Sequence, residues 1–172
     1  NWIDPSAIEV LINTGAYDTN GIFLWIRTNI LEKNECQFRL TYEICRILAQ
    51  SQNTRGHRLA YQIACKMDRN TPHVSVIPPP VFSAEILTYL IPYIEGEDKL
   101  KHIFTQANRW LQGKDQEQYS ITLLLALGKK EYKDAQEKIY ELANHAVTQL
   151  RYYANYKPFT EYLWVMFAQW DT

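Results

Sequence analysis

The sequence predicts an all-α fold of about eight helices, because three of its features favour helix over sheet. Apolar residues recur three and four positions apart along almost the whole chain of 172 residues. Glycine occurs only six times, and single glycines or short polar stretches separate the periodic segments. Hydrophobic residues make up 47% of the chain, which at this length can bury a sizeable core. We therefore expect a compact helical bundle, built either as one unit or as two helical lobes.

Residues 1–68 are predicted to form an N-terminal portion of four helices. Pro5 lies in the first turn of the first helix, and Gly15 ends that helix. A polar turn at 51–56 separates the third helix from the fourth. The expected core positions of the four helices are, in chain order, Ile8, Leu11 and Ile12; Ile22, Phe23, Trp25, Ile26, Ile30 and Leu31; Phe38, Leu40, Ile44, Ile47 and Leu48; and Leu59, Ala60, Ile63, Ala64 and Met67.

Residues 69–81 are predicted to be an extended, proline-rich connector. They include Pro78, Pro79 and Pro80, and each proline removes a backbone donor and fixes φ near −65°. We interpret the segment as a stiff connector within one domain, with a hinge between two independent lobes as the alternative, since each half alone is small for a core.

Residues 82–172 are predicted to form a C-terminal helical portion of similar size. Ser83 caps its first helix, and Gly113 ends the next one. A strongly apolar helix follows, and after Gly128 a long helix is expected to run to about Tyr156, ahead of a short aromatic one. The expected core positions are Ile86, Leu87 and Leu90; Leu100, Ile103, Phe104, Ala107, Trp110 and Leu111; Ile121, Leu123, Leu124, Leu125 and Leu127; and Tyr132, Ala135, Ile139, Leu142, Ala143, Ala146, Leu150 and Tyr153.

Two short strings are similar to parts of helical repeat families. The stretch Leu127-Gly128 with Tyr132, Ala135, Ile139 and Leu142 resembles the second helix of a tetratricopeptide repeat. The string Ile8-Glu9-Val10-Leu11-Ile12, followed by Gly15-Ala16, resembles the helix end of an ankyrin unit. Neither string returns one period later, whereas repeat folds stack several units. We therefore interpret both as helix-turn-helix packing and carry no family residues over.

Charge and cysteine usage narrow the class of protein. The net charge of −1 predicts no overall attraction to nucleic acid or to a membrane, and no apolar run approaches the roughly 20 residues of a membrane-spanning helix. Cys36, Cys45 and Cys65 are an odd number of cysteines without metal-site spacing. We expect an intracellular, reducing compartment, with Cys45 and Cys65 as small core residues.

The sequence assigns no catalytic residue, metal or cofactor. It lacks the glycine-rich phosphate loops, the nucleophile elbow and the paired-histidine zinc motif. Only two histidines have a carboxylate three or four positions away, in the pairs Asp98 with His102 and Glu141 with His145. We interpret both as solvated surface pairs. We therefore expect a protein that is not an enzyme, with an enzyme of unknown class as the third alternative.

A basic stripe is predicted on the fourth helix. Arg55, Arg58, Lys66 and Arg69 fall on one helical face, opposite the apolar positions, and Tyr61 lies nearby. Such a face suits phosphate neutralisation with ring stacking on bases. The alternative is an ordinary solvated face, which the overall charge favours.

Aromatic residues crowd the C-terminal segment. Eight rings occur within residues 152–170, more than one helical stripe can hold. Because tyrosine and tryptophan anchors dominate interface energies, we expect part of this segment to contact a partner, with simple core closure as the alternative. The expected interface residues are Tyr152, Tyr156, Phe159, Tyr162, Trp164 and Trp170.

These patterns favour a helical protein-interaction or scaffold domain that binds a protein partner or associates with itself. The alternative is a helical nucleic-acid-binding subunit of nucleoprotein or coat type, with the basic stripe on the phosphates. No membrane partner is expected.

Overall fold

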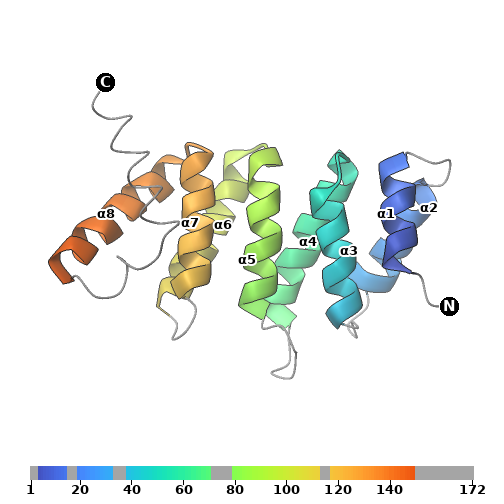
Figure 1. Cartoon of the computed structure of the whole chain (residues 1–172), viewed down its shortest axis with the longest axis horizontal. Helices are drawn as coiled ribbons and strands as arrows, with labels where there is room; N and C mark the ends of the chain where they lie inside the picture. Colours follow the sequence, from blue (N-terminus) through green and yellow to red (C-terminus); the bar gives the residue numbers. More distant parts are fainter. Residues whose placement is uncertain (1–3, 15–18, 33–37, 71–78, 113–116, 150–172) are drawn as a thin grey trace. The chain divides into compact units, whose positions relative to one another are not determined.

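The computed structural model describes residues 4–14, 19–32, 38–70, 79–112 and 117–149 (Figure 1). These residues form eight α-helices and no strand, which confirms the predicted all-α fold. The elements are α1 (Pro5–Thr14), α2 (Thr19–Ile26), the π-helical η1 (Arg27–Leu31), α3 (Phe38–Gln50), α4 (Thr54–Asn70), α5 (Pro79–Leu90), the 3-10 turn η2 (Ile91–Tyr93), α6 (Glu97–Leu111), α7 (Glu117–Lys129) and α8 (Lys133–Gln149).

The chain divides into two compact units, Asn1–Tyr93 and Ile94–Thr172. The division falls after α5 rather than at the proline-rich segment. Ser83 of α5 donates a hydrogen bond from Oγ to the carbonyl oxygen of Ala64 in α4, at 3.1 Å. The buried hydroxyl thus ties α5 to the helix that precedes the prolines, and α5 belongs to the first unit.

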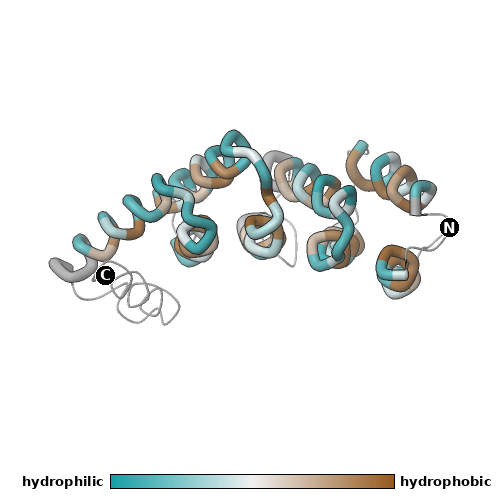
Figure 2. The backbone as a smooth tube through the Cα atoms, turned by 90° about the horizontal axis from the view of Figure 1, so that it is seen from above, coloured by the Kyte–Doolittle hydropathy of each residue, from teal (hydrophilic) through white to brown (hydrophobic). Residues whose placement is uncertain are grey.

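The first unit is a stack of helices in two layers. In both views α1, α3 and α5 lie side by side, and α2 with η1 and α4 lie behind them (Figures 1 and 2). Apolar side chains from both layers meet between them and form the core. The largest fully buried ones are Ile8, Ile26, Ile44, Leu48, Ile63, Phe82, Ile86, Leu87, Leu90 and Ile91. Leu11, an expected core position, is instead 37% exposed.

The second unit packs α6 on α7 and α7 on α8. Ser120 of α7 is fully buried and donates from Oγ to the carbonyl oxygen of Ala107 in α6, at 2.6 Å. In both units, therefore, a buried serine hydroxyl donates a hydrogen bond to a backbone carbonyl of the preceding helix. The buried residues of this unit include Ile103, Ala107, Trp110, Ile121, Leu123, Leu124, Leu127, Ala135, Ile139 and Ala143.

The helix bounds correct the predicted connector at both of its ends. Helix α4 continues to Asn70, and α5 begins at Pro79 and includes Pro80 and Val81. Prolines fit the first turn of a helix because the backbone N–H groups there have no intrahelical acceptor and φ near −65° suits the helix. Residues 71–78 lie outside the described residues.

A second correction concerns the end of α7. The sequence predicts a break at Gly128, but α7 passes through this buried glycine and reaches Lys129. The chain turns at Glu131 instead, whose φ is 63°. The N–H of Glu131 donates to the Gly128 carbonyl at 2.9 Å and that of Tyr132 to the Leu127 carbonyl at 3.0 Å, the pattern of a Schellman motif. Of the predicted long helix, the part after Gln149 lies outside the described residues.

Candidate functional site

The basic stripe begins at a well-defined helix start. Asn53 precedes α4, and its Oδ1 accepts hydrogen bonds from the backbone N–H groups of Arg55 at 2.9 Å and Gly56 at 3.2 Å. This cap sets the first turn of α4. Arg55 and Arg58 are exposed one turn apart, and Lys66 is half-buried further along. The side chain of Arg69 lies outside the described residues.

Two of the stripe's cations contact the neighbouring helix. Arg55 donates from Nη1 to Oδ1 of Asn20, and its guanidinium lies 5.5 Å from the ring centroid of Phe23 in α2. Lys66 donates from Nζ to the carbonyl oxygen of Leu31 at the end of η1. The structure thus does not present a row of unoccupied cations. Tyr61 is half-buried, and it also has contacts within the chain.

The predicted aromatic interface, Tyr152, Tyr156, Phe159, Tyr162, Trp164 and Trp170, lies outside the described residues. Exposed tyrosines occur elsewhere. Tyr89 is 41% exposed and Tyr93 is 50% exposed, both in the first unit. Sequence reasoning missed them, although the spacing of Glu85 and Tyr89 places two polar-tipped side chains one turn apart on one side of α5.

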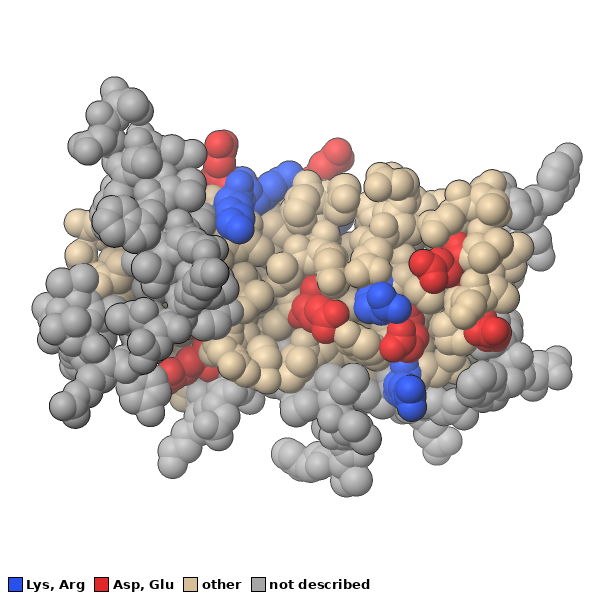
Figure 3. All heavy atoms as spheres, in the orientation of Figure 1, with Lys and Arg blue, Asp and Glu red and all other residues tan. Residues whose placement is uncertain are grey.

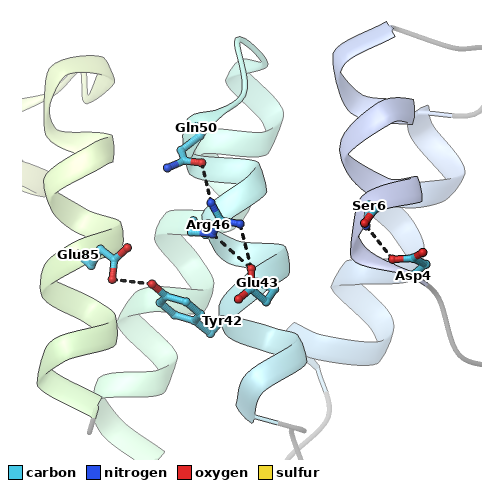
Figure 4. A network of polar contacts seen from close by, with 7 residues as sticks. All are labelled: Asp4, Ser6, Tyr42, Glu43, Arg46, Gln50 and Glu85. Atoms are coloured by element: carbon cyan, nitrogen blue, oxygen red, sulfur yellow. Dashed lines mark hydrogen bonds and ion pairs between the residues drawn. The ribbon is translucent and has the colours of Figure 1, made fainter. Parts of the chain in front are cut away.

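Tyr42 and Glu85 join α3 to α5 at the molecular surface. The Tyr42 hydroxyl donates to Oε2 of Glu85 at 2.6 Å (Figure 4). The Tyr42 ring also meets Phe82 edge-on, with centroids 5.4 Å apart. Partial burial, and then the hydrogen bond to Glu85, raise the pKa of Tyr42 well above its ordinary value. The phenol therefore stays a donor, and the pair holds its geometry at neutral pH.

Arg46 lies one turn beyond Tyr42 and is held from both sides. Its Nη2 and Nε donate to Oε2 of Glu43 at 3.0 and 3.3 Å, and Nη1 donates to Oε1 of Gln50 at 3.3 Å (Figure 4). The hydrogen bonds to Glu43 raise the pKa of Arg46, and the charge of Glu9 in α1 acts in the same direction. The guanidinium is thus charged and fixed in orientation.

The register of α3 and α5 aligns these residues into one surface. The two helices run in the same direction, because both lie antiparallel to α4 (Figure 1). With Tyr42 opposite Glu85, one further turn along each helix leads to Arg46 and Tyr89. Past the end of α5, Tyr93 stacks on His57 with centroids 4.4 Å apart and an interplanar angle of 29°. Tyr93 thus contacts α4 rather than α3. We call the surface formed by Tyr42, Arg46, Gln50, Glu85 and Tyr89 the tyrosine face.

Cys45 is a core residue of the first unit. Cys45 is fully buried, and burial, with a smaller contribution from Cys65, raises the pKa of its thiol. Its Sγ lies 3.4 Å from the Ala60 carbonyl oxygen, to which it donates. The prediction of a core role is confirmed for Cys45, whereas Cys65 is half-buried and Cys36 lies outside the described residues. Among the residues that the structure describes, no group of three or more His, Cys, Asp or Glu could hold a metal ion.

Comparison of the chain with known protein families, with curated proteins and with solved structures finds no match. Within the described part of the chain, no helix is both long and apolar enough to span a bilayer.

Proposed function

We propose that this chain is a non-enzymatic helical protein-interaction domain and that its tyrosine face binds another polypeptide. The observation that carries the proposal is the exposure of Tyr89, one turn beyond Glu85 on α5, on the side where Glu85 meets Tyr42 and where Arg46 follows Tyr42 on α3. Tyrosine and arginine are enriched at protein interfaces, where they supply a large contact area and a polar tip.

Preorganisation supports the proposal. Immobilising a flexible side chain on binding has an entropic cost, which is smaller where internal contacts already hold the side chain. Hydrogen bonds to Glu43 and Gln50 hold the Arg46 guanidinium, and a hydrogen bond to Glu85 holds the Tyr42 hydroxyl. A partner would therefore meet a surface whose side chains are already in place.

The nucleic-acid alternative has less support. Neutralising a phosphate backbone needs several accessible cations along one path. Arg55 and Lys66 already donate to protein oxygens, and Arg55 also covers the ring of Phe23. The geometry therefore favours a protein partner over nucleic acid.

A peptide-display selection on the whole chain tests the proposal. We expect selected peptides to lose at least about tenfold in affinity for the Tyr89→Ala variant, as is typical of a hot-spot aromatic. The matched control is Tyr140→Ala, which removes a 44% exposed tyrosine from α8 in the second unit and should leave affinity unchanged. The proposal is wrong if no peptide is selected, or if all selected peptides bind the Tyr89→Ala variant as tightly as the wild-type chain.

A further inference from the structure

Charge is segregated between the two layers of the first unit. Among the described side chains, the layer of α1, α3 and α5 carries four carboxylates and two cations, and Figure 3 shows these groups spread over that face. The layer of α2, η1 and α4 carries four cations and one carboxylate. In chain order these are Asp4, Glu9, Arg39, Glu43, Arg46 and Glu85 in the first layer, and Arg27, Glu32, Arg55, Arg58 and Lys66 in the second. A net charge of −1 for the whole chain hides this asymmetry.

The second layer contains a strip where two helices lie side by side. Arg55 at the start of α4 contacts Asn20 at the start of α2, and Lys66 further along α4 contacts Leu31 at the end of η1. The two segments therefore run in the same direction, with a cation of α4 reaching across at each end. We call the exposed residues Asn20, Leu24, Arg55, Arg58 and Gln62 the α2–α4 strip.

The strip combines an exposed apolar side chain, Leu24, with an exposed positive charge, Arg58. Leu24 lies one turn beyond Asn20 on the same side of α2 and is 65% exposed. Arg58 is exposed one turn beyond Arg55, and it makes no hydrogen bond or ion pair within the described part of the chain. Leu24 directly follows Phe23, over whose ring the Arg55 guanidinium lies, and Arg58 is one turn beyond Arg55 on α4. The strip thus combines an exposed leucine on α2 with two arginines on the neighbouring helix.

We propose that the α2–α4 strip binds an acidic peptide segment that carries an apolar anchor residue. The apolar side chain of the peptide would cover Leu24, and its carboxylates would face Arg58 and Arg55. Carboxylates match guanidinium groups in geometry as well as in charge. This inference rests on the proposed function only in that the chain binds polypeptides, because the strip and the tyrosine face share no residue.

A peptide fits the strip better than a nucleic acid does. Leu24 has no π face on which a base could stack, and burying it needs an apolar group on the partner. Lys66 and Arg55 donate to protein oxygens, so the cations do not form a continuous path for a phosphate backbone. The observations therefore favour a ligand with a few carboxylates around one apolar residue.

The same display selection tests the strip with its own variants. Peptides that bind there should be enriched in Asp and Glu around an aliphatic or aromatic residue. Their affinity should fall about tenfold or more for Arg58→Glu, and several-fold when salt is raised from about 50 to about 300 mM. Leu24→Ser should also lower the affinity of these peptides about tenfold.

The matched controls are Lys101→Glu, which reverses an exposed cation of α6, and Val10→Ser, which replaces a 60% exposed apolar residue of α1. Neither should change the affinity.

The outcomes separate this inference from the proposed function. If every selected peptide loses affinity for Tyr89→Ala but binds Arg58→Glu and Leu24→Ser as tightly as the wild-type chain, the tyrosine face is supported and the strip proposal is wrong. If every selected peptide loses affinity for Arg58→Glu and Leu24→Ser but not for Tyr89→Ala, the strip is supported and the tyrosine-face proposal is wrong. If a single-stranded RNA oligomer binds, loses affinity with Arg58→Glu and is unaffected by Leu24→Ser, the strip is a phosphate-binding surface and the peptide proposal is wrong.

Discussion

The two units close their helical hairpins in opposite ways. Between α3 and α4 the turn depends on side chains: Ser51 Oγ donates to the Leu48 carbonyl oxygen and accepts from the Asn53 N–H, and Asn53 caps α4. Between α7 and α8 the turn depends on backbone hydrogen bonds, with Glu131 in the left-handed region. The first turn thus has the residues that its geometry favours, and the second lacks the glycine that its geometry favours. Substitutions in the two turns should therefore have opposite signs.

Buried polar groups differ between the units in the same way. In the first unit, Ser83 and Ser51 are buried and each donates a hydrogen bond. In the second, Ser120 donates a hydrogen bond, but Nε2 of Gln106 in α6 is buried without a partner among the residues that the structure describes. An unsatisfied buried donor lowers stability. Replacing Gln106 by an apolar residue should therefore stabilise the second unit.

The largest expected effect comes from breaking the α3–α4 turn with Gly56→Val. A Cβ at this buried position would lie 2.9 Å from Ser51 Oγ and 3.3 Å from the Leu48 carbonyl oxygen. The carbonyl is backbone and cannot rotate away, so we expect a loss of about 2 kcal/mol in the free energy of unfolding, measured by urea denaturation. Gly56→Ala should lose less, because the Ser51 hydroxyl can rotate. A valine variant as stable as the wild-type chain would contradict the close approach of the two helices.

Gln106→Met should stabilise the second unit. The methionine has a similar volume and removes the unpartnered amide donor, so we expect a gain of about 1.5 kcal/mol in the free energy of unfolding. Ser120→Ala, on the adjacent helix, is the opposite case and should lower the stability, because it removes a satisfied hydrogen bond. Thermal unfolding of both variants distinguishes them by sign. If Gln106→Met lowers the melting temperature, the amide has a partner in solution.

Asn53→Ala tests the cap of α4. The substitution removes an acceptor for two backbone N–H groups, and we expect a loss of about 1 kcal/mol in urea denaturation. Asn53→Ser should retain most of the stability, because a serine hydroxyl also caps helices. Equal losses for alanine and serine would mean that Asn53 acts through another contact.

Glu131→Gly has the smallest expected effect and the opposite sign. Glycine adopts φ near 63° without the steric cost of a Cβ, so the variant should gain about 0.7 kcal/mol in the free energy of unfolding. Glu131→Ala is the control, because alanine keeps the Cβ and should bring no such gain. Differential scanning calorimetry of the two variants provides the comparison, and equal stabilities for glycine and alanine would refute the left-handed conformation of this residue.

The helices themselves could be predicted from local pattern, but the candidate surfaces could not. Periodicity places the core stripe of α4, and with it Arg55 and Arg58 on the outer side. No local pattern reveals that Tyr42 would meet Glu85, 43 positions away, because this pairing depends on how α3 and α5 pack. The sequence likewise predicts one accessible basic stripe, either as a phosphate-binding face or as an ordinary solvated one, whereas the packing of α2 against α4 gives Arg55 and Lys66 partners in α2 and η1.

The sequence by itself determined the all-α class and the amphipathic faces, since these depend on the spacing of side chains within each helix. Only the structure decided that α4 begins at Thr54 behind the Asn53 cap, that α5 belongs with α3 and α4, that the α7–α8 turn falls at Glu131, and that Leu24 is exposed. The physical reason is that burial depends on which helix covers which face. That choice is made by the packing of side chains distant in the sequence, which hydrophobic periodicity along one helix does not encode.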